Sequence, residues 1–300
     1  MSSQTPDKSS IDAAARTFME RSSAPGLAIG IVTPDSTKVF SYGVASKETG
    51  NPVDERTVFE IGSISKTFTA ALAAYAAESG ALTWNASPSR YISELKGSAL
   101  DRVSLLNLAT HTTGGMPLQL PDDVKTNADL TAYFRRWIPP SQPGTVRTYA
   151  NPSIGLLGVV TARAMKGRFA ALVRERITRP LGLQHTFHDV PKAEQEHYAQ
   201  GYTAGRQAGQ GLDSSSGHGS LWRSHYSARS AAVRGGATRP DRSEPHDAAL
   251  PLRDAGRSFP SRTDDAGADL GVVSAPRLGR RSRGWQRRPD GAQAHLGYAA

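Results

Sequence analysis

Apolar positions near the start of the chain follow two different periods, one typical of a helix and one typical of strands. Residues 11–21 place apolar side chains on one helical face, after Ser9 and Ser10 as candidate caps. Residues 26–33 and 38–44 are short apolar runs separated by turn-forming residues. The pattern predicts a helix followed by a β-hairpin. That hairpin needs further strands, because two strands alone are marginally stable.

Helices dominate the next part of the chain. Residues 67–80 are rich in Ala and Leu and end in a glycine that suits a helix C-terminus, so they form the best-defined predicted helix. Shorter helices are predicted over residues 104–110, 127–137, 153–165 and 168–179. The helix over 153–165 is expected to start there because Pro152 precedes it.

The last 97 residues have a different composition. Residues 204–300 hold 15 arginines and 9 acidic residues but no lysine, so they carry +6 of the net charge of +9. Leu, Val, Phe and Ile make up 11 of these 97 residues. At that share a charged segment buries too little apolar surface to offset its chain entropy. We therefore expect no independent fold in this tail.

The absence of cysteine limits the chemistry available to the chain. Its 300 residues include no Cys, which excludes disulfides, thiolate-bound zinc, iron–sulfur clusters and a thiol nucleophile. The polar start shows no signal peptide, and no apolar run reaches the roughly 18 residues of a membrane span. We expect a soluble or mature chain with no membrane partner.

Two Ser-x-x-Lys patterns occur, at Ser63–Lys66 and at Ser93–Lys96. Residues three apart share one helix face, so an unprotonated amine can take the hydroxyl proton and create a nucleophile. Ser63 follows a glycine and opens the best-defined helix, whose N-terminus favours developing negative charge. Ser93 lies in a short segment with no long helix after it. The context favours Ser63 as the functional serine and a cap or surface pair for Ser93.

A phenol and two amides complete the candidate site. Tyr149 and Asn151 lie in a loop ahead of Pro152, where the phenol can shuttle a proton and the amide can clamp a substrate. Gln119 is a loop amide of the same kind. Taken alone, each of these residues is more typical of an ordinary solvated loop.

Four segments in order resemble the penicillin-recognising serine hydrolases, specifically the class C β-lactamases. They are FEIGSISKTFTAAL around Ser63, LLNLATHTTGGMPLQLPDDV around Gln119, PGTVRTYANPSIGLLG around Tyr149, and RPLGLQHTF ending at Phe187. The resemblance covers roughly residues 10 to 203. The Ser-x-x-Lys and Tyr-x-Asn elements also lie about 85 residues apart, as they do in that family.

The resemblance implies an α/β fold of the serine β-lactamase/transpeptidase type. Residues 1–60 would form the helix and hairpin of an α/β domain, and residues 61–203 a mostly helical domain that carries both motifs. Residues 204–300 would be a basic tail, which leaves the α/β domain without its C-terminal strands. Relatives of this kind are usually monomers in the bacterial periplasm and use no metal or organic cofactor.

The resemblance also implies a mechanism. Ser63 would attack the lactam carbonyl while Lys66 and Tyr149 share its proton, and a water activated near Tyr149 would then hydrolyse the acyl-enzyme. Asn151 and Gln119 would hold the substrate's side-chain amide. His111 stands where relatives often have Tyr, and we assign it no role at this stage.

The family's third element, Lys-Thr-Gly on a strand beside the cleft, is missing. The chain has no lysine after Lys192, so the motif and the oxyanion-hole N–H on its strand are lost, and an inactive enzyme is an open alternative for this chain. We explain this by a frameshift from about Ala204. Residues 205–211 and 230–236 both admit codons that, read one nucleotide later, give the family-like segments Asp-Gly-Lys-Pro-Val-Arg and Leu-Leu-Arg-Phe-Val-Glu. A gene sequence without Lys-Thr-Gly codons in that frame would refute the frameshift.

Other functions are open on sequence grounds. The arginine-rich tail is compatible with polyanion binding by a non-catalytic remnant, although interspersed acids lead us to expect no nucleic-acid partner. His185 and His188 form the only close histidine pair, and without an H-E-x-x-H pattern a metal site is not predicted. A D-alanyl-D-alanine peptidase or an esterase of the same superfamily shares both catalytic motifs and differs from a β-lactamase in deacylation.

Overall fold

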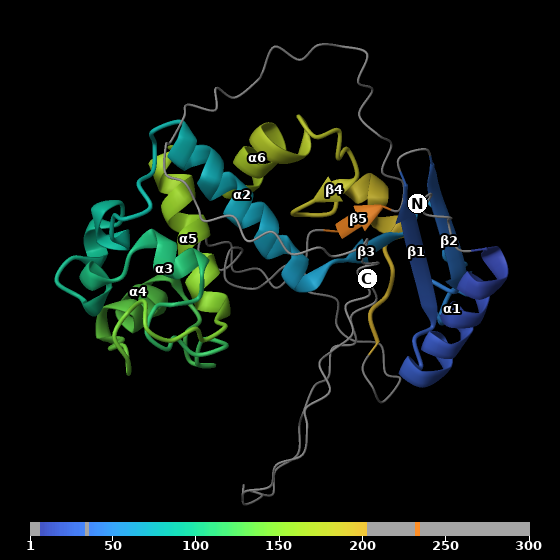
Figure 1. Ribbon diagram of the computed structural model, residues 1–300, viewed down its shortest axis with the longest axis horizontal. Helices are drawn as coiled ribbons and strands as arrows, with labels where there is room; N and C mark the ends of the chain where they lie inside the picture. The colour runs from blue at the N-terminus through green and yellow to red at the C-terminus, as the bar shows by residue number, and fades with distance from the viewer. Residues whose placement is uncertain (1–6, 34–35, 203–231, 235–300) are drawn as a thin grey trace, which may run out of the picture. The chain divides into compact units, whose positions relative to one another are not determined.

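The computed structural model describes residues 7–33 and 36–202 and the backbone of residues 232–234 (Figure 1). The first element is helix α1 (Lys8–Ser22), which packs against strand β1. Asp7 caps this helix, because its carboxylate accepts the Ser10 N–H at 2.8 Å. The prediction of Ser9 or Ser10 as the cap was therefore wrong, since an acidic side chain one position earlier reaches the same free amide.

The predicted hairpin is confirmed. Strands β1 (Gly26–Val32) and β2 (Thr37–Gly43) pair antiparallel, with Ile29 opposite Phe40. The Tyr42 hydroxyl donates to the Asp12 carboxylate at 2.8 Å and joins the hairpin to α1. Among the described residues no third strand pairs with these two, so the helix supplies the packing that the hairpin needs.

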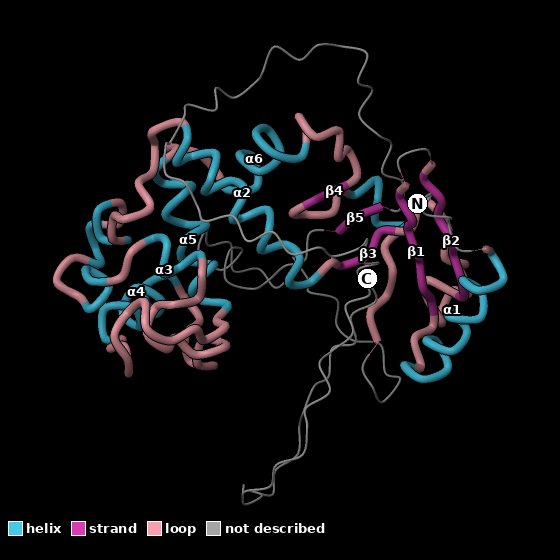
Figure 2. Tube along the Cα trace, viewed as in Figure 1, coloured by secondary structure: helices cyan, strands magenta, loops and turns pink. Residues whose placement is uncertain are grey.

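A second sheet has three very short strands in the order β3–β5–β4 (Figure 2). Strand β3 spans Val58–Glu60, β4 spans Thr186–Phe187 and β5 spans Ala232–Arg234. Both pairings are antiparallel. Two or three residues are too few to show an alternating pattern, which is why none of these strands was predicted. Strand β5 belongs to the predicted basic tail, and it pairs with strands from the preceding part of the chain.

The rest of the predicted tail lies outside the described residues, as does the proposed frameshift. Within the described ranges, no helix is both long enough and apolar enough to cross a lipid bilayer.

Five α-helices follow β3 along the described chain. They are α2 (Ser65–Glu78), α3 (Leu105–Ala109), α4 (Asn127–Arg136), α5 (Asn151–Ala164) and α6 (Phe169–Val173), the last continuing as a π-helical turn over Arg174–Thr178. All the predicted helices are present. Helix α5 starts at Asn151 rather than at Ser153, because Pro152 is tolerated inside the first turn, where its missing N–H has no intrahelical acceptor.

Short 3₁₀ turns connect several of these helices. They span Gly62–Ile64, Pro88–Arg90, Ser93–Leu95, Ala99–Arg102 and Lys192–His197. The main core of this region is made of apolar side chains that are fully or almost fully buried, including Leu95, Leu100, Leu108, Phe134, Leu156 and Leu157.

Helix α5 is the central element of the helical region. Every residue from Pro152 to Ala162 is buried, as expected of a helix that is apolar all round. Helices α2 and α6 both pack against it. At Gly158 a Cβ atom would lie 3.2 Å from the Phe169 ring and 3.4 Å from the Thr69 methyl group, so glycine permits this close approach. The packing fixes the N-terminus of α2 relative to that of α5, and these two termini carry the candidate site.

Candidate active site

Ser63 lies in a tight turn between strand β3 and helix α2. Gly62 has a φ of +51°, a left-handed backbone that glycine adopts without strain, and it starts the 3₁₀ turn Gly62–Ile64. The Ser65 hydroxyl donates to the Gly62 carbonyl and closes this turn. Ser63 therefore precedes α2 rather than forming its first residue, and it lies at the positive end of that helix.

Two of the predicted site residues, Lys66 and Tyr149, donate hydrogen bonds to the side-chain oxygen of a third, Ser63. The Lys66 Nζ donates to Ser63 Oγ at 3.0 Å, and the Tyr149 hydroxyl donates to the same Oγ at 2.9 Å. Lys66 Nζ also lies 5.0 Å from the centre of the Tyr149 ring. Ser63 and Lys66 are half-buried, whereas Tyr149 is 38% exposed. The hydroxyl thus contacts an amine and a phenol at a partly exposed position.

The two predicted amides lie on adjoining segments. Asn151 is the first residue of α5, and its backbone N–H donates to the Leu118 carbonyl at 3.0 Å, which brings the loop with Gln119 beside the start of α5. Gln119 is exposed. The Asn151 Oδ1 atom is buried and has no hydrogen-bond partner among the described residues. An unpaired buried acceptor of this kind is uncommon in folded proteins.

Sequence reasoning missed one residue of this site, His111. Its ring packs against the Tyr149 ring with centroids 4.6 Å apart, and its Nδ1 accepts the Ala150 N–H at 3.3 Å. It is 7% exposed, and burial, followed by the positive charges of Arg147 and Lys66, lowers its pKa from the ordinary value. His111 directly follows the C-cap of α3 and has a φ of +59°. A histidine at this position, where glycine is usual, is the sequence signal that could have identified it.

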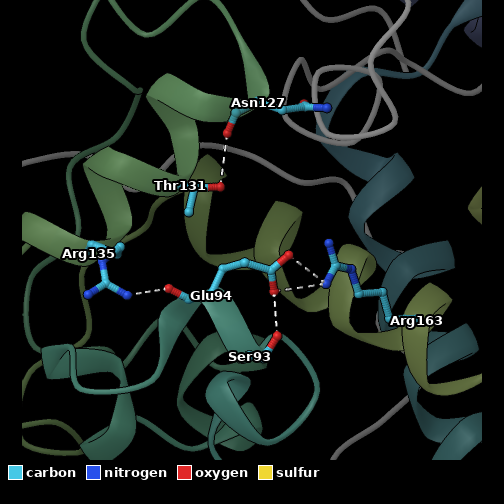
Figure 3. Close-up of polar contacts among 6 residues, drawn as sticks. All are labelled: Ser93, Glu94, Asn127, Thr131, Arg135 and Arg163. Atoms are coloured by element: carbon cyan, nitrogen blue, oxygen red, sulfur yellow. Dashed lines mark hydrogen bonds and ion pairs between the residues drawn. The ribbon is translucent and has the colours of Figure 1, made fainter.

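The second Ser-x-x-Lys pattern, at Ser93–Lys96, lies in a surface turn that hydrogen bonds and an ion pair hold to neighbouring helices (Figure 3). The Ser93 hydroxyl donates to the Glu94 carboxylate at 3.0 Å, and that carboxylate pairs with Arg163 of α5 at 3.4 Å. Arg135 of α4 donates to the Glu94 carbonyl at 2.6 Å. Ser93 and Lys96 are both exposed. These contacts join a surface turn to two helices, and the catalytic role of Ser63 rather than Ser93 stays a prediction.

The histidine pair considered as a metal site lies near acidic side chains. His185 Nδ1 is 3.5 Å from Glu194, and His188 Nδ1 is 3.3 Å from Asp189. Across the described ranges, no three side chains of the metal-binding types gather into a ligand set.

Comparison with known proteins gives matches to one family. The profile of the Beta-lactamase family matches residues 11–297. A beta-lactamase of Providencia stuartii is 44% identical over 197 residues, which are 66% of this chain and 51% of that protein. The chain therefore spans about half the length of this curated relative.

Two solved structures are similar to the chain. A beta-lactamase/D-alanine carboxypeptidase from Pseudomonas syringae superposes with a TM-score of 0.68 at 39% identity, covering 75% of this chain and 61% of the other. A class C beta lactamase from Rhodobacter sphaeroides gives a TM-score of 0.67 at 36% identity, with coverage of 75% and 61%. The fold is the α/β serine hydrolase fold of these proteins.

Proposed function

Since the chain belongs to the beta-lactamase family, we propose that it is a serine β-lactamase of the class C, cephalosporinase type that opens the β-lactam amide through an acyl-enzyme on Ser63. The observation that carries this proposal is the contact of one hydroxyl with two proton-transfer groups. Ser63 Oγ lies 3.0 Å from the Lys66 amine and 2.9 Å from the Tyr149 phenol. Both distances are within the range in which a side chain can act as a general base.

In the proposed reaction, Lys66 and Tyr149 together accept and return the transferred protons. One member of the pair, the Lys66 amine or the Tyr149 oxygen, must be unprotonated, and it takes the Ser63 proton as Oγ bonds to the lactam carbonyl carbon. The carbon–nitrogen bond of the ring then breaks, and the ring nitrogen takes a proton from the same pair. A water molecule next attacks the ester and gives a proton to the pair. Ser63 leaves with that proton, and the starting state is restored.

The negative charge of the tetrahedral intermediate develops beside Ser63. The Ser63 N–H, at the positive end of α2, is the proposed oxyanion donor. The sequence has no lysine after Lys192, so the family's Lys-Thr-Gly strand does not supply the second donor. Loss of one such donor typically lowers the rate by about 10²–10³, and we expect this chain to be a correspondingly slow enzyme.

Two amides are proposed to hold the substrate. The unpaired Oδ1 of Asn151 would accept the N–H of the β-lactam side chain, while Gln119 on the adjoining loop would contact the same amide. The proposed partner is therefore a small β-lactam, with no nucleic acid involved. By family resemblance we propose a periplasmic monomer.

A D-alanine carboxypeptidase is the second candidate function. The Pseudomonas syringae relative is described as both a beta-lactamase and a D-alanine carboxypeptidase, and its identity to this chain, 39%, is close to that of the curated beta-lactamase. Both functions use the same acylation chemistry. They differ in whether water removes the acyl group from a β-lactam quickly.

Turnover by the full chain separates the candidates. The 300-residue protein is incubated with a chromogenic cephalosporin, a D-alanyl-D-alanine peptide and a p-nitrophenyl ester, with Ser63→Ala as the control. We expect repeated turnover of the cephalosporin by the unmodified chain and none by S63A. Turnover of the peptide or ester alone would favour the second candidate or an esterase, and equal rates with S63A would refute a role for Ser63.

A further inference from the structure

His111 contacts three consecutive residues of the loop that carries the phenol. Its backbone carbonyl accepts the Thr148 N–H at 2.9 Å, and its Nδ1 accepts the Ala150 N–H at 3.3 Å. Its ring packs against the Tyr149 ring, with centroids 4.6 Å apart and an angle of 40° between the planes. The backbone on both sides of Tyr149 and the Tyr149 ring itself are therefore held by a single residue.

We propose that His111 is a positioning residue that keeps the Tyr149 phenol against Ser63 Oγ. This inference rests on the proposed function, in which Tyr149 moves the proton. Tyr149 is 38% exposed and precedes the first residue of α5 by two positions, so the helix itself does not orient its ring. A misplacement of about 1 Å at a reacting group can lower a rate about 100-fold.

His111 is itself held firmly. It is 7% exposed and lies just after α3, whose N-terminus carries a capping box made by Ser104 and Asn107. The buried Ser153 hydroxyl of α5 donates to the Leu108 carbonyl of α3 at 2.6 Å. Because α3 is tied to α5 in this way, His111 and the loop before α5 share one rigid support.

The backbone conformation of His111 also indicates that the surrounding contacts hold this residue in place. Its φ of +59° is a left-handed conformation that few non-glycine residues adopt, although histidine adopts it more often than most. Such a conformation persists only when its surroundings impose it. Here the surroundings include the two hydrogen bonds to Thr148 and Ala150.

The Nδ1 contact requires a neutral ring. Nδ1 accepts the Ala150 N–H, so the ring proton is on Nε2, and protonation would replace this acceptor by a donor that faces another donor. The charged and titratable groups that face His111 are Lys66 at the start of α2, and Arg147 and Tyr149 in the loop before α5. Both cations disfavour protonation of His111. The contacts of His111 with the loop that carries Tyr149 should therefore weaken only when the pH falls below the ordinary pKa of histidine.

Two variants separate the contacts of His111. His111→Asn tolerates the left-handed backbone and keeps a side-chain acceptor but loses the ring, whereas His111→Phe keeps a ring and loses the acceptor. The matched control is His185→Asn, which removes a part-exposed histidine that pairs with Glu194. For each protein the rate constant for acylation of Ser63 by a slowly hydrolysed cephalosporin is measured from pH 4.5 to 8 by intact mass.

We expect about 10- to 100-fold slower acylation in both His111 variants and no change in H185N. We also expect acylation by the unmodified chain to slow at some pH below 6.5, and this slowing to be absent from both variants, an effect that a merely structural role would not produce. Equal rates and an unchanged slowing at low pH in H111N and H111F would overturn the inference.

A second measurement does not depend on activity. In protein labelled with ¹³C-tyrosine, the Tyr149 signal is assigned by its loss in Tyr149→Phe. It should shift as His111 titrates and change in both His111 variants, and a Tyr149 signal unaffected by pH and by the substitutions would refute the inference. If the labelled chain behaves as expected but forms no adduct with any β-lactam, the proposed function fails and the positioning role of His111 stands.

Discussion

Tyr149 donates its phenolic hydrogen to Ser63 Oγ over 2.9 Å, although the two residues are 86 positions apart in the chain. The contact depends on the packing of α2 against α5, because Ser63 precedes the first helix and Tyr149 precedes the second.

Tyr149→Phe removes the phenol and keeps the ring. We expect acylation of Ser63 to slow by about 10²–10⁴, the usual contribution of a positioned proton-transfer group. The measurement is the rate of adduct formation with a slowly hydrolysed cephalosporin. The control is Tyr75→Phe, in which the altered tyrosine lies on α2 and packs against a cluster of buried side chains that includes Leu72 and Phe169. Equal rates in the two variants would show that the phenol takes no part.

The two Ser-x-x-Lys patterns should respond differently to the same change. Lys66→Ala is expected to abolish measurable acylation, whereas Lys96→Ala and Ser93→Ala should leave it unchanged. Glu94→Ala should lower the free energy of unfolding by at most about 1 kcal/mol, because exposed ion pairs contribute little. Urea unfolding and adduct formation are measured on the same samples. A large loss of acylation in S93A or K96A would contradict the assignment of the catalytic pair.

Gly158→Val tests the packing that positions the site. The new side chain would meet Phe169 and Thr69, where even a Cβ atom lies within 3.4 Å of both. We expect the free energy of unfolding to fall by about 1–3 kcal/mol, the usual cost of overpacking a core. Ala74→Val on the exposed face of α2 should cost only about 0.5 kcal/mol in helix propensity. Similar costs at both positions would mean that α2 and α5 are not closely packed at Gly158.

His111 should make stability depend on pH. Burial, followed by the charges of Arg147 and Lys66, lowers the pKa of His111 below its ordinary value of 6.5. The unfolded chain therefore binds this proton at a higher pH than the folded chain does, and the free energy of unfolding falls as the pH drops from about 6.5 toward the folded pKa. Urea unfolding of the unmodified chain and of H111N between pH 4.5 and 7.5 should show a flatter profile for the variant. Parallel profiles would show that the pKa of His111 is the same in the folded and the unfolded chain.

The parts of the fold predicted from sequence are those with a strong local signal. Helix α2 has many good helix formers, and the hairpin has two short apolar runs around a turn, so both were found. Strands β3 and β4 have two or three residues each, and nothing local distinguishes them from loop. Their pairing with β5 depends on contacts between segments far apart in the chain.

The candidate site shows the same limit. The Ser-x-x-Lys spacing occurs twice, so the sequence context was needed to favour Ser63 over Ser93, and the resemblance to a known family distinguished Tyr149 from an ordinary loop tyrosine. His111 acts through backbone groups of Thr148 and Ala150. Such contacts depend on the path of the chain and leave no residue pattern, apart from a histidine where a glycine would end the helix.

Acylation of Ser63 by a β-lactam tests the account most directly. The full chain and its S63A variant are incubated with a slowly hydrolysed cephalosporin, and intact and peptide masses are recorded. We predict a single covalent adduct on the peptide that contains Ser63 and none in S63A. A folded chain that forms no adduct at saturating β-lactam, or one labelled at another residue, would contradict it.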